Sequence, residues 1–226
     1  MPHVTKKYAH AVIAADVAIF TVREGALQVL LIKMKKEPYI RHWALPGGLI
    51  QGTETADQAA RRHLGTKAGV RKAYLEQLYT FSRVNRDPFG RVVSVAYIAL
   101  IPSDNLHLAT TDEYADVRWF SISDLPPLAY DHREIIEYAM RRLAAKLEYT
   151  NIASSLLPAE FTLQELQQIY ETILGRPLDK RNFRKKLLSL AILKEASGKK
   201  TTGAHRPAQL YAFVRRTPQT IQILAS

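Results

Sequence analysis

One stretch, from Pro46 to Val70, restricts the folds open to this chain more than any other part of its sequence. It reads PGGLIQGTETADQAARRHLGTKAGV and follows an apolar run that is typical of a β-strand. The Gly-Gly pair indicates a turn, and the four-residue spacing of Ala56, Ala60 and Leu64 indicates one apolar face of a helix. The stretch therefore predicts a loop, a helix and a second loop.

The segments around this stretch have the composition of strands. They are rich in Val, Ile, Leu and aromatic residues and are separated by turn residues. We expect strands at Ala11 to Val22, Leu27 to Met34, Tyr74 to Phe81, Val92 to Ile101 and Asp116 to Phe120. The first two are joined by a hairpin that contains Gly25.

The loop between the third and fourth of these strands carries three arginines, Arg83, Arg86 and Arg91. Asp87, Pro88 and Gly90 mark it as a turn, and a solvated hairpin tip is one interpretation. The other is a binding loop, because the planar guanidinium suits phosphate and ribose recognition.

A helix is expected from Asp131, with Glu134 three residues later completing a capping box. His132 is read as a structural residue rather than a catalytic base, because it stands beside the expected capping aspartate. The polar stretch from Glu148 to Ser155 follows the apolar stripe of this helix, and we interpret it as a linker.

The stretch from Pro46 to Val70 resembles the Nudix box, and the preceding Trp43-Ala44-Leu45-Pro46-Gly47-Gly48 also looks like Nudix proteins. The positions that match the box pattern are Gly48, Glu54, Arg62, Leu64, Gly69 and Val70. Three positions where that family has glutamates depart from it, since they hold His63, Thr66 and Lys67. The string RDPFGRVVSVAY further resembles the ADP-ribose pyrophosphatase-like branch of that superfamily.

The loss of these three glutamates affects metal binding and catalysis. In Nudix enzymes the glutamates lie on one helix face and hold Mg²⁺ or Mn²⁺ against a diphosphate. An imidazole, a hydroxyl and an ammonium do not replace three carboxylates, and Lys67 adds a positive charge where a cation would bind. We therefore expect no catalytic residues, no metal and no cofactor, and a pocket that receives a nucleoside diphosphate without metal.

Charge is unevenly distributed along the 226 residues. Residues 151–226 hold 12 Lys and Arg against 5 Asp and Glu, whereas residues 1–150 hold 20 against 16. A basic C-terminal part is typical of proteins that bind nucleic acid, although a solvated basic face has the same composition. The chain has no cysteine, no apolar run long enough to span a bilayer and no signal-peptide pattern, so we expect no membrane partner and a cytoplasmic location.

The C-terminal part has the pattern of a helix-turn-helix. Thr162 and Glu165 form a capping box, and the helix that they start is expected to end at Gly175. A second helix begins near Asp179 and has an apolar face of Phe183, Leu187, Leu188 and Leu190. Such a helix enters the major groove, where Arg or Asn reads base edges and basic groups contact phosphates.

Two strand-like segments, Ala191 to Ala196 and Gln209 to Val214, follow this helix. The basic segment between them, Ser197 to Ala208, is expected to form the tip of a wing, and a lysine-rich loop without such a role is the alternative. The residues predicted to bind DNA are Lys180, Arg181, Asn182, Arg184, Lys185, Lys186, Lys199, Lys200, His205 and Arg206.

The combination of a degenerate Nudix box and a winged helix resembles the Nudix-related transcriptional regulators, the NrtR family. The resemblance implies an α+β fold in which residues 1–150 form a Nudix-like α/β/α sandwich with a mixed sheet and residues 151–226 form a winged helix-turn-helix. It also implies a homodimeric repressor of a palindromic operator that senses ADP-ribose or a related metabolite of NAD or sugar metabolism.

The residues that we expect around the ligand are Arg41, Trp43, Gly48, Arg62, Lys67, Arg83, Arg86 and Arg91. Trp43 is also consistent with a core position. Two other functions remain open from the residues alone. One is a pyrophosphatase acting on ADP-ribose or a dinucleotide with Glu54 and acids outside the box, and the other is an interaction module with a vestigial pocket.

Overall fold

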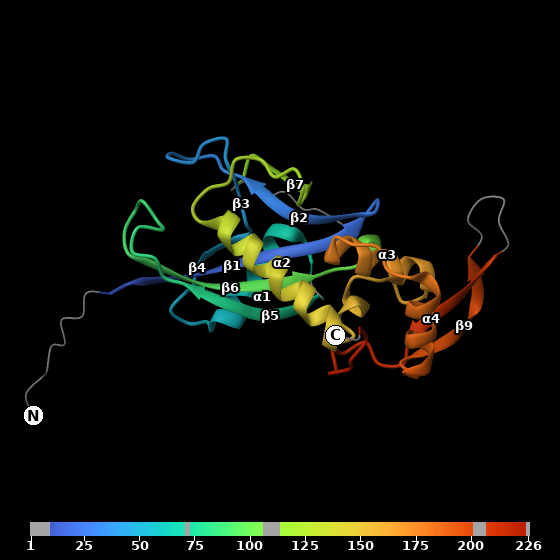
Figure 1. Ribbon diagram of the computed structural model, residues 1–226. Coiled ribbons are helices and arrows are strands. Elements are labelled where there is room, and N and C mark those ends of the chain that lie inside the picture. Colours follow the sequence, from blue (N-terminus) through green and yellow to red (C-terminus); the bar gives the residue numbers. More distant parts are fainter. Residues whose placement is uncertain (1–9, 71–72, 106–113, 201–206, 225–226) are drawn as a thin grey trace, which may run out of the picture.

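The computed structural model describes residues 10–70, 73–105, 114–200 and 207–224 (Figure 1). Its N-terminal part is built on a mixed sheet whose strands run in the order β3-β2-β1-β6-β5. These are β1 (Val12–Arg23), β2 (Ala26–Lys33), β3 (Trp43–Ala44), β5 (Tyr74–Phe81) and β6 (Val92–Leu100). Two further strands lie off this path, β4 (Gly47–Leu49) on β1 and β7 (Asp116–Ser121) on β2.

Strand β1 is the centre of this sheet. It pairs antiparallel with β2 and β4 and parallel with β6. Its side chains alternate between two buried clusters, with Val17 and Ile19 on one face and Ala18 and Phe20 on the other. A strand that is apolar on both faces must be covered on both sides.

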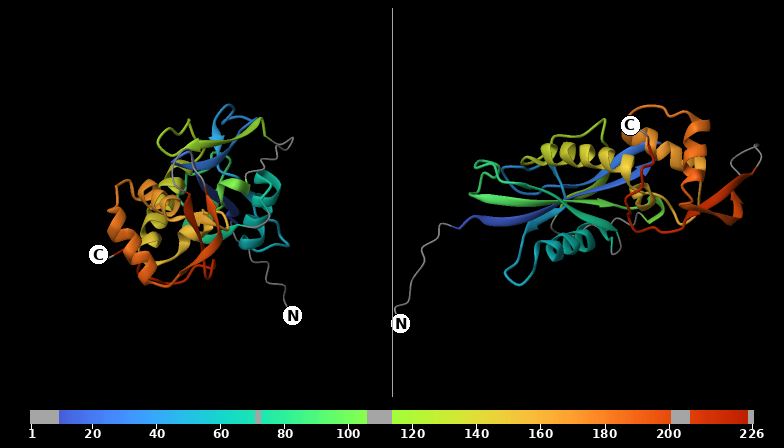
Figure 2. Two further views of the ribbon diagram at one scale, coloured as in Figure 1. Left: turned by 90° about the vertical axis from the view of Figure 1, so that its right-hand side faces the viewer. Right: turned by 60° about the horizontal axis from the view of Figure 1, so that its bottom comes forward.

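Two helices provide that cover, as Figure 2 shows. Helix α1 (Ala56–Ala68) packs Ala59, Ala60 and Leu64 against one face of the sheet, and α2 (His132–Tyr149) packs on the other. Thr55 caps α1 in a capping box with Gln58, and Gly69 ends it with a φ of 67°. The loop-helix-loop prediction for this stretch is confirmed. A short 3-10 turn, η1 (Ser103–Asn105), follows β6.

The C-terminal part contains η2 (Ile152–Ser155), β8 (Phe161–Thr162), α3 (Leu163–Leu174), α4 (Lys180–Ser189), β9 (Leu193–Lys200) and β10 (Ala208–Phe213). The predicted capping box of Thr162 and Glu165 is present on α3, and Gly175 ends that helix in the left-handed region. Strands β8, β10 and β9 form one small sheet beside the two helices. This is a winged helix-turn-helix, as predicted.

The predicted linker from Glu148 to Ser155 is wrong. Helix α2 continues to Tyr149, and Asn151, Ile152, Ala153 and Ser154 are fully buried. The polar residues of this segment contact the segment that follows β10, since Asn151 donates from Nδ2 to the Arg215 carbonyl at 3.0 Å and Ser154 donates to the Arg216 carbonyl at 3.0 Å. Polarity marks buried hydrogen bonds here, not exposure.

As a result, one hydrophobic core extends from the α2 face of the sheet into the winged helix. It includes Phe20 and Ile98 from the sheet, Leu143 from α2, and Leu166 and Phe183 from the helix-turn-helix. Thr172 of α3 also donates to the Gly25 carbonyl at the tip of the β1–β2 hairpin, at 3.1 Å. Among the described residues, no helix is both long and apolar enough to cross a membrane.

Candidate ligand pocket and DNA-binding face

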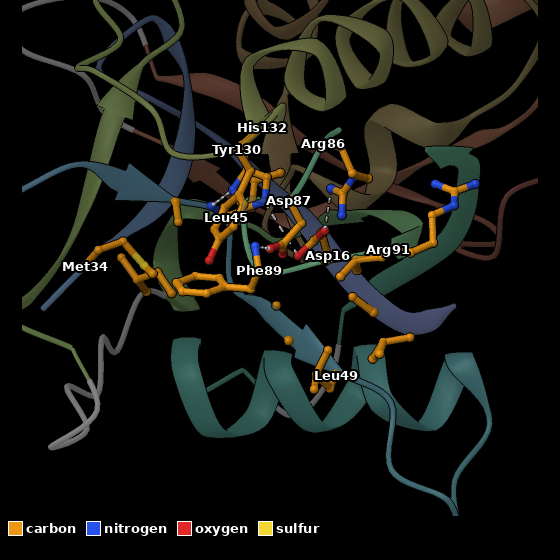
Figure 3. Close-up of a pocket in the computed structure, with 18 of the residues that line it drawn as sticks. Asp16, Met34, Leu45, Leu49, Arg86, Asp87, Phe89, Arg91, Tyr130 and His132 are labelled. Atoms are coloured by element: carbon orange, nitrogen blue, oxygen red, sulfur yellow. Dashed lines mark hydrogen bonds and ion pairs between the residues drawn. The ribbon is translucent and has the colours of Figure 1, made fainter. Parts of the chain in front are cut away.

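A cavity of about 390 Å³ opens where β1, β4, the 82–91 loop and the start of α2 meet (Figure 3). This volume is in the range of pockets for small molecules. Apolar side chains such as Met34, Leu45 and Phe89 line much of it, and Tyr114 and Tyr130 add aromatic rings. The cavity therefore suits a ligand with both apolar and charged parts.

A buried ionic network forms one wall of the pocket. Arg86 is 6% exposed and binds both oxygens of Asp131, with Nε at 2.9 Å and Nη2 at 2.6 Å. Its Nη2 also lies 3.4 Å from Oδ2 of Asp16, which accepts a hydrogen bond from the Ser94 hydroxyl at 2.6 Å. Burial alone would raise the pKa of Asp16, but the neighbouring His132, Ser94 and Arg86 hold it below its usual value.

The prediction of a capping box at the start of α2 is wrong, because the buried ionic network engages the capping residue. Asp131 occupies the N-cap position but makes no capping hydrogen bond with its side chain, because both of its oxygens are held by Arg86. Glu134 instead forms an exposed ion pair with Arg83 at 2.9 Å. The first turn of α2 is thus fixed by the 82–91 loop.

His132 is buried and structural in its contacts. The backbone N–H of Leu45 donates to its Nδ1 at 2.8 Å, so that this nitrogen carries no proton and Nε2 carries the hydrogen. Nε2 lies 3.7 Å from Oδ1 of Asp16. The ring therefore links α2 to β1 and to the strand-to-turn segment before Gly47.

The Gly-Gly turn is packed too closely for side chains. A Cβ at Gly47 would lie 2.1 Å from Oδ1 of Asp16 and 2.8 Å from the Ala15 carbonyl. Gly48 has a φ of 153°, and a Cβ there would lie 3.2 Å from the ring of His63 on α1. Both glycines bring the backbone of β4 to the pocket wall.

Glu54, the one glutamate of the box that is retained, is clamped by Arg62. The guanidinium donates from Nε to Oε2 at 2.9 Å and from Nη2 to Oε1 at 2.5 Å. The hydrogen bonds from Arg62 and the Gln51 backbone lower the pKa of Glu54 to about 2. The carboxylate is therefore ionised and already bound to a cation of its own chain.

The three substituted box positions have different surroundings. Thr66 is exposed and donates to the Arg62 carbonyl at 2.8 Å, as expected for a helix hydroxyl. His63 is 2% exposed, and neither ring nitrogen has a hydrogen-bond partner among the described residues. Burial, followed by the charges of Lys67 and Arg62, lowers the pKa of His63 to about 4, so the ring is neutral near pH 7.

Lys67 is the most unusual of the three, because a buried lysine needs partners. It is 7% exposed, and its Nζ donates to the Gly47 carbonyl at 2.5 Å and to the Tyr114 hydroxyl. The resemblance to Nudix proteins implies a divalent cation at this helix, but these residues do not fit one. Within the described part of the chain, no three His, Asp or Glu side chains are arranged to hold a metal ion.

The structure brings together three of the residues predicted to bind the ligand, since Gly48, Arg86 and Arg91 line the pocket. Arg91 is exposed and donates from Nη1 to the carbonyls of Ser82 and Arg83. The other five, Arg41, Trp43, Arg62, Lys67 and Arg83, lie outside the lining.

Trp43 is 7% exposed and meets Phe120 edge-on in the core, the alternative considered from the sequence. Arg41 is exposed in the loop before β3, with a φ of 70°.

Sequence reasoning missed Asp16 as a pocket residue and Asp131 as the partner that holds Arg86 in the pocket wall. A usable signal existed for Asp16, because an aspartate within the apolar run from Ala11 to Val22 must be buried with a partner. Asp131 carried no comparable signal, since a helix N-cap explained it equally well.

The candidate DNA-binding face lies on α4. Asp179 caps the helix by accepting from the Asn182 backbone N–H at 2.8 Å. Phe183 and Leu187 are buried, whereas Lys180, Arg181, Asn182 and Lys185 are exposed. Arg184 and Lys186 are half-buried at the sides of the helix. Leu188, predicted on the apolar face, is 51% exposed, so that prediction is wrong.

The wing differs from its prediction in length. Strand β9 extends to Lys200, so that Ser197 to Lys200 belong to the strand instead of the tip, and the last two of them pair with β10. Lys199 and Lys200 are opposite Gln209 and Ala208. His205 and Arg206 lie outside the described residues.

Comparisons with known proteins agree with this architecture. A model of the NUDIX domain matches residues 12–139, and a model of the NrtR DNA-binding winged helix domain matches residues 153–213. The chain is 37% identical over 210 residues to the ADPR responsive transcriptional repressor NtrR of Acinetobacter baylyi, a match that covers 91% of this chain and 83% of that protein.

Two solved structures are also similar. The first is Shewanella oneidensis NrtR complexed with a 27mer DNA, with a TM-score of 0.79, 34% identity and coverage of 89% of this chain and 93% of that one. The second is the NUDIX domain of the same protein complexed with ADP ribose, with a TM-score of 0.55, 33% identity and coverage of 62% and 92%. The predicted α+β fold, a Nudix domain followed by a winged helix, is confirmed.

Proposed function

The chain belongs to the NrtR family of Nudix-related transcriptional regulators, and from this premise we propose that it is a repressor that binds operator DNA and responds to ADP-ribose. One observation of the structure carries the proposal. A single helix, α2, begins at the ligand pocket and ends in the core of the winged helix, so the two candidate sites share a rigid element.

On the DNA side, α4 enters the major groove. Arg181 and Asn182 are exposed on its first turn and have the side chains that read guanine and adenine edges. Lys180 and Lys185 contact phosphates, and the wing lies along the backbone. The active species is a homodimer that presents two α4 helices to the half-sites of a palindromic operator.

On the effector side, the pocket holds ADP-ribose or a closely related phosphorylated metabolite. Support comes from the cavity volume, its mixture of aromatic and charged lining residues, and the ligand named for the similar NUDIX domain. Arg86 makes the site responsive, because an anionic ligand that attracts its guanidinium weakens the grip of Arg86 on Asp131. Helix α2, about 27 Å long at 1.5 Å per residue, carries the resulting shift to the winged helix.

The pocket binds its ligand without hydrolysing it. Glu54 is the one acid at the retained box position, and its carboxylate is held by Arg62. A bacterial repressor acts on chromosomal DNA, so we place its action in the cytoplasm.

Selection of bound fragments from a random DNA pool, with and without ADP-ribose, tests this function. The expected result is an enriched palindromic sequence whose recovery changes when ADP-ribose is added. Recovery without sequence preference, or a palindrome whose binding ignores ADP-ribose and related nucleotides, would contradict the proposal.

A turnover assay addresses the enzymatic alternative. ADP-ribose with Mg²⁺ is incubated with the protein and with a Glu54→Gln variant, and nucleoside monophosphate is measured. We expect no sustained product from either. Multiple turnovers by the wild type that are abolished by the substitution would identify a pyrophosphatase.

A further inference from the structure

Lys67 brings a positive charge directly behind the wall of the ligand pocket. Its ammonium donates to the Gly47 carbonyl at 2.5 Å and lies 4.7 Å from the ring centroid of Tyr114. Gly47 and Tyr114 both line the cavity, whereas Lys67 does not. The charge is therefore fixed in place and shielded from solvent by its own partners.

This charge sets the electrostatic balance of the pocket. Asp16 and Asp87 line the cavity and Asp131 stands behind Arg86, which gives three carboxylates. Two guanidiniums, of Arg86 and Arg91, oppose them. Counted over the described residues, these groups would carry a net negative charge without the ammonium and would repel a diphosphate, and such repulsion is strong where water is excluded.

The same neighbourhood disfavours a bound metal ion. The carboxylate of Glu54 is engaged by two nitrogens of Arg62, and the neutral ring of His63 is next to Lys67 in the helix. A divalent cation placed here would meet two fixed positive charges and one carboxylate that is already paired.

We propose that the pocket binds the diphosphate of its ligand without a divalent cation, and that Lys67 supplies the fixed positive charge that the metal ion supplies in Nudix enzymes. The inference rests on the proposed function for the identity of the ligand. It adds that effector sensing is independent of the concentration of free Mg²⁺.

Calorimetric titration of ADP-ribose into the full-length protein tests this, in one buffer with EDTA and in one with MgCl₂. The dissociation constants of the wild type should agree within about twofold, because no ion is taken up on binding. Tight binding in MgCl₂ that is lost in EDTA would overturn the inference.

Two variants of α1 distinguish the effect of the charge beside the pocket from the effect of the protein's overall positive charge. Lys67→Met should weaken ADP-ribose binding by about tenfold or more in both buffers, as expected for a lost charged interaction. Arg61→Met removes an equal charge from an exposed position of the same helix and should bind as the wild type does. Equal effects of the two substitutions would contradict the assigned role of Lys67.

Lys67→Glu adds a reversed test, because it restores a carboxylate to the box. This variant should bind ADP-ribose poorly in EDTA and regain affinity when Mg²⁺ or Mn²⁺ is added. If it bound ADP-ribose in EDTA as strongly as the wild type does, the proposal would be contradicted. Binding of each variant to operator DNA, with its thermal unfolding, reports whether it is folded. If a Lys67 variant does not fold, the wild-type comparison of the two buffers still decides whether the ligand needs a divalent cation.

Failure of this inference differs from failure of the proposed function. A protein that needs Mg²⁺ for ADP-ribose but still changes its DNA affinity with the ligand is a regulator with a metal site. A protein that binds operator DNA and never binds ADP-ribose would refute the effector assignment instead.

Discussion

The basic residues of α1 and of α4 have opposite surroundings. Lys67 and Arg62 on α1 point to partners in their own domain, the Gly47 carbonyl and the Glu54 carboxylate. Lys180, Arg181 and Lys185 on α4 are exposed, and none of them forms an ion pair with another described residue. Charges that are held internally shape a small pocket, whereas charges that are left exposed remain available to a polyanion.

The contrast extends to the ionic contacts at the start of α2. Arg86 and Asp131 form a pair with side chains 3% and 7% exposed, and Arg83 and Glu134 form a pair with side chains 63% and 46% exposed. Both pairs join the 82–91 loop to the same helical turn. They differ in burial and in the number of contacts, since Arg86 binds both oxygens of Asp131 and also reaches Asp16, whereas Arg83 makes one contact with Glu134, so the exposed pair is a control for the buried network.

The largest effect is expected from Arg86→Met, which leaves Asp16 and Asp131 as buried carboxylates without their cation. The free energy of unfolding should fall by about 3–5 kcal/mol, as for other broken buried pairs. Arg83→Met should cost less than about 1 kcal/mol, because its pair is exposed. Urea unfolding followed by circular dichroism measures both, and equal losses would remove the distinction between the two pairs.

Asp131→Asn should have the next largest effect, on communication between the sites. It keeps the shape of the side chain but removes the charge that holds Arg86, so the effect of ADP-ribose on operator affinity should shrink by a few-fold, within the usual 1–3 kcal/mol of coupling. Glu134→Gln is the control and should retain the wild-type response. Fluorescence anisotropy with labelled operator, at several ADP-ribose concentrations, gives the coupling, and an unchanged response in Asp131→Asn would exclude this route.

Lys185→Ala tests the exposed basic residues of α4. Loss of one phosphate contact per protomer should weaken operator binding by about tenfold and lower the slope of log affinity against log salt by about 2 for a dimer. Arg133→Ala removes an exposed charge from the first turn of α2 and should leave both quantities unchanged. Affinity measured from low to moderate salt distinguishes these outcomes, and an intact slope in Lys185→Ala would show that the assigned face is wrong.

The smallest expected effect is on the pH dependence of stability, and it appears only at acidic pH. Since burial lowers the pKa of His63 to about 4, the native protein binds fewer protons than the unfolded chain between about pH 6.5 and pH 4. Stability should therefore decline as the pH falls through this window, and His63→Gln should make the decline shallower by at most about one proton. Identical slopes for the two proteins would contradict a buried, neutral His63.

Much of the fold could be predicted because its signals are local. The Gly-Gly turn, the spacing of Ala56, Ala60 and Leu64, and the capping box of Thr162 and Glu165 all depend on residues within a few positions of one another. The predictions failed where a partner is distant in sequence. Asp131 has the sequence pattern of a helix cap, and no local signal identifies Arg86, 45 residues earlier, as its partner.

The segment after α2 shows the same limit. Asn151 and Ser154 read as an exposed linker, yet their hydrogen bonds go to Arg215 and Arg216 across more than 60 residues. In the sequence, a polar residue that faces water cannot be distinguished from one that donates to a buried carbonyl. The sequence therefore did not reveal that the α2 face of the sheet and the winged helix share one hydrophobic core.

The reciprocity of binding tests the central claim, that the pocket and the DNA-binding face are linked through α2. Operator affinity is measured with and without saturating ADP-ribose, and ADP-ribose affinity is measured with and without operator. Linkage predicts that both affinities change by the same factor, about 5-fold to 150-fold. Two ligands that bind the same protein with no effect on each other would contradict the account.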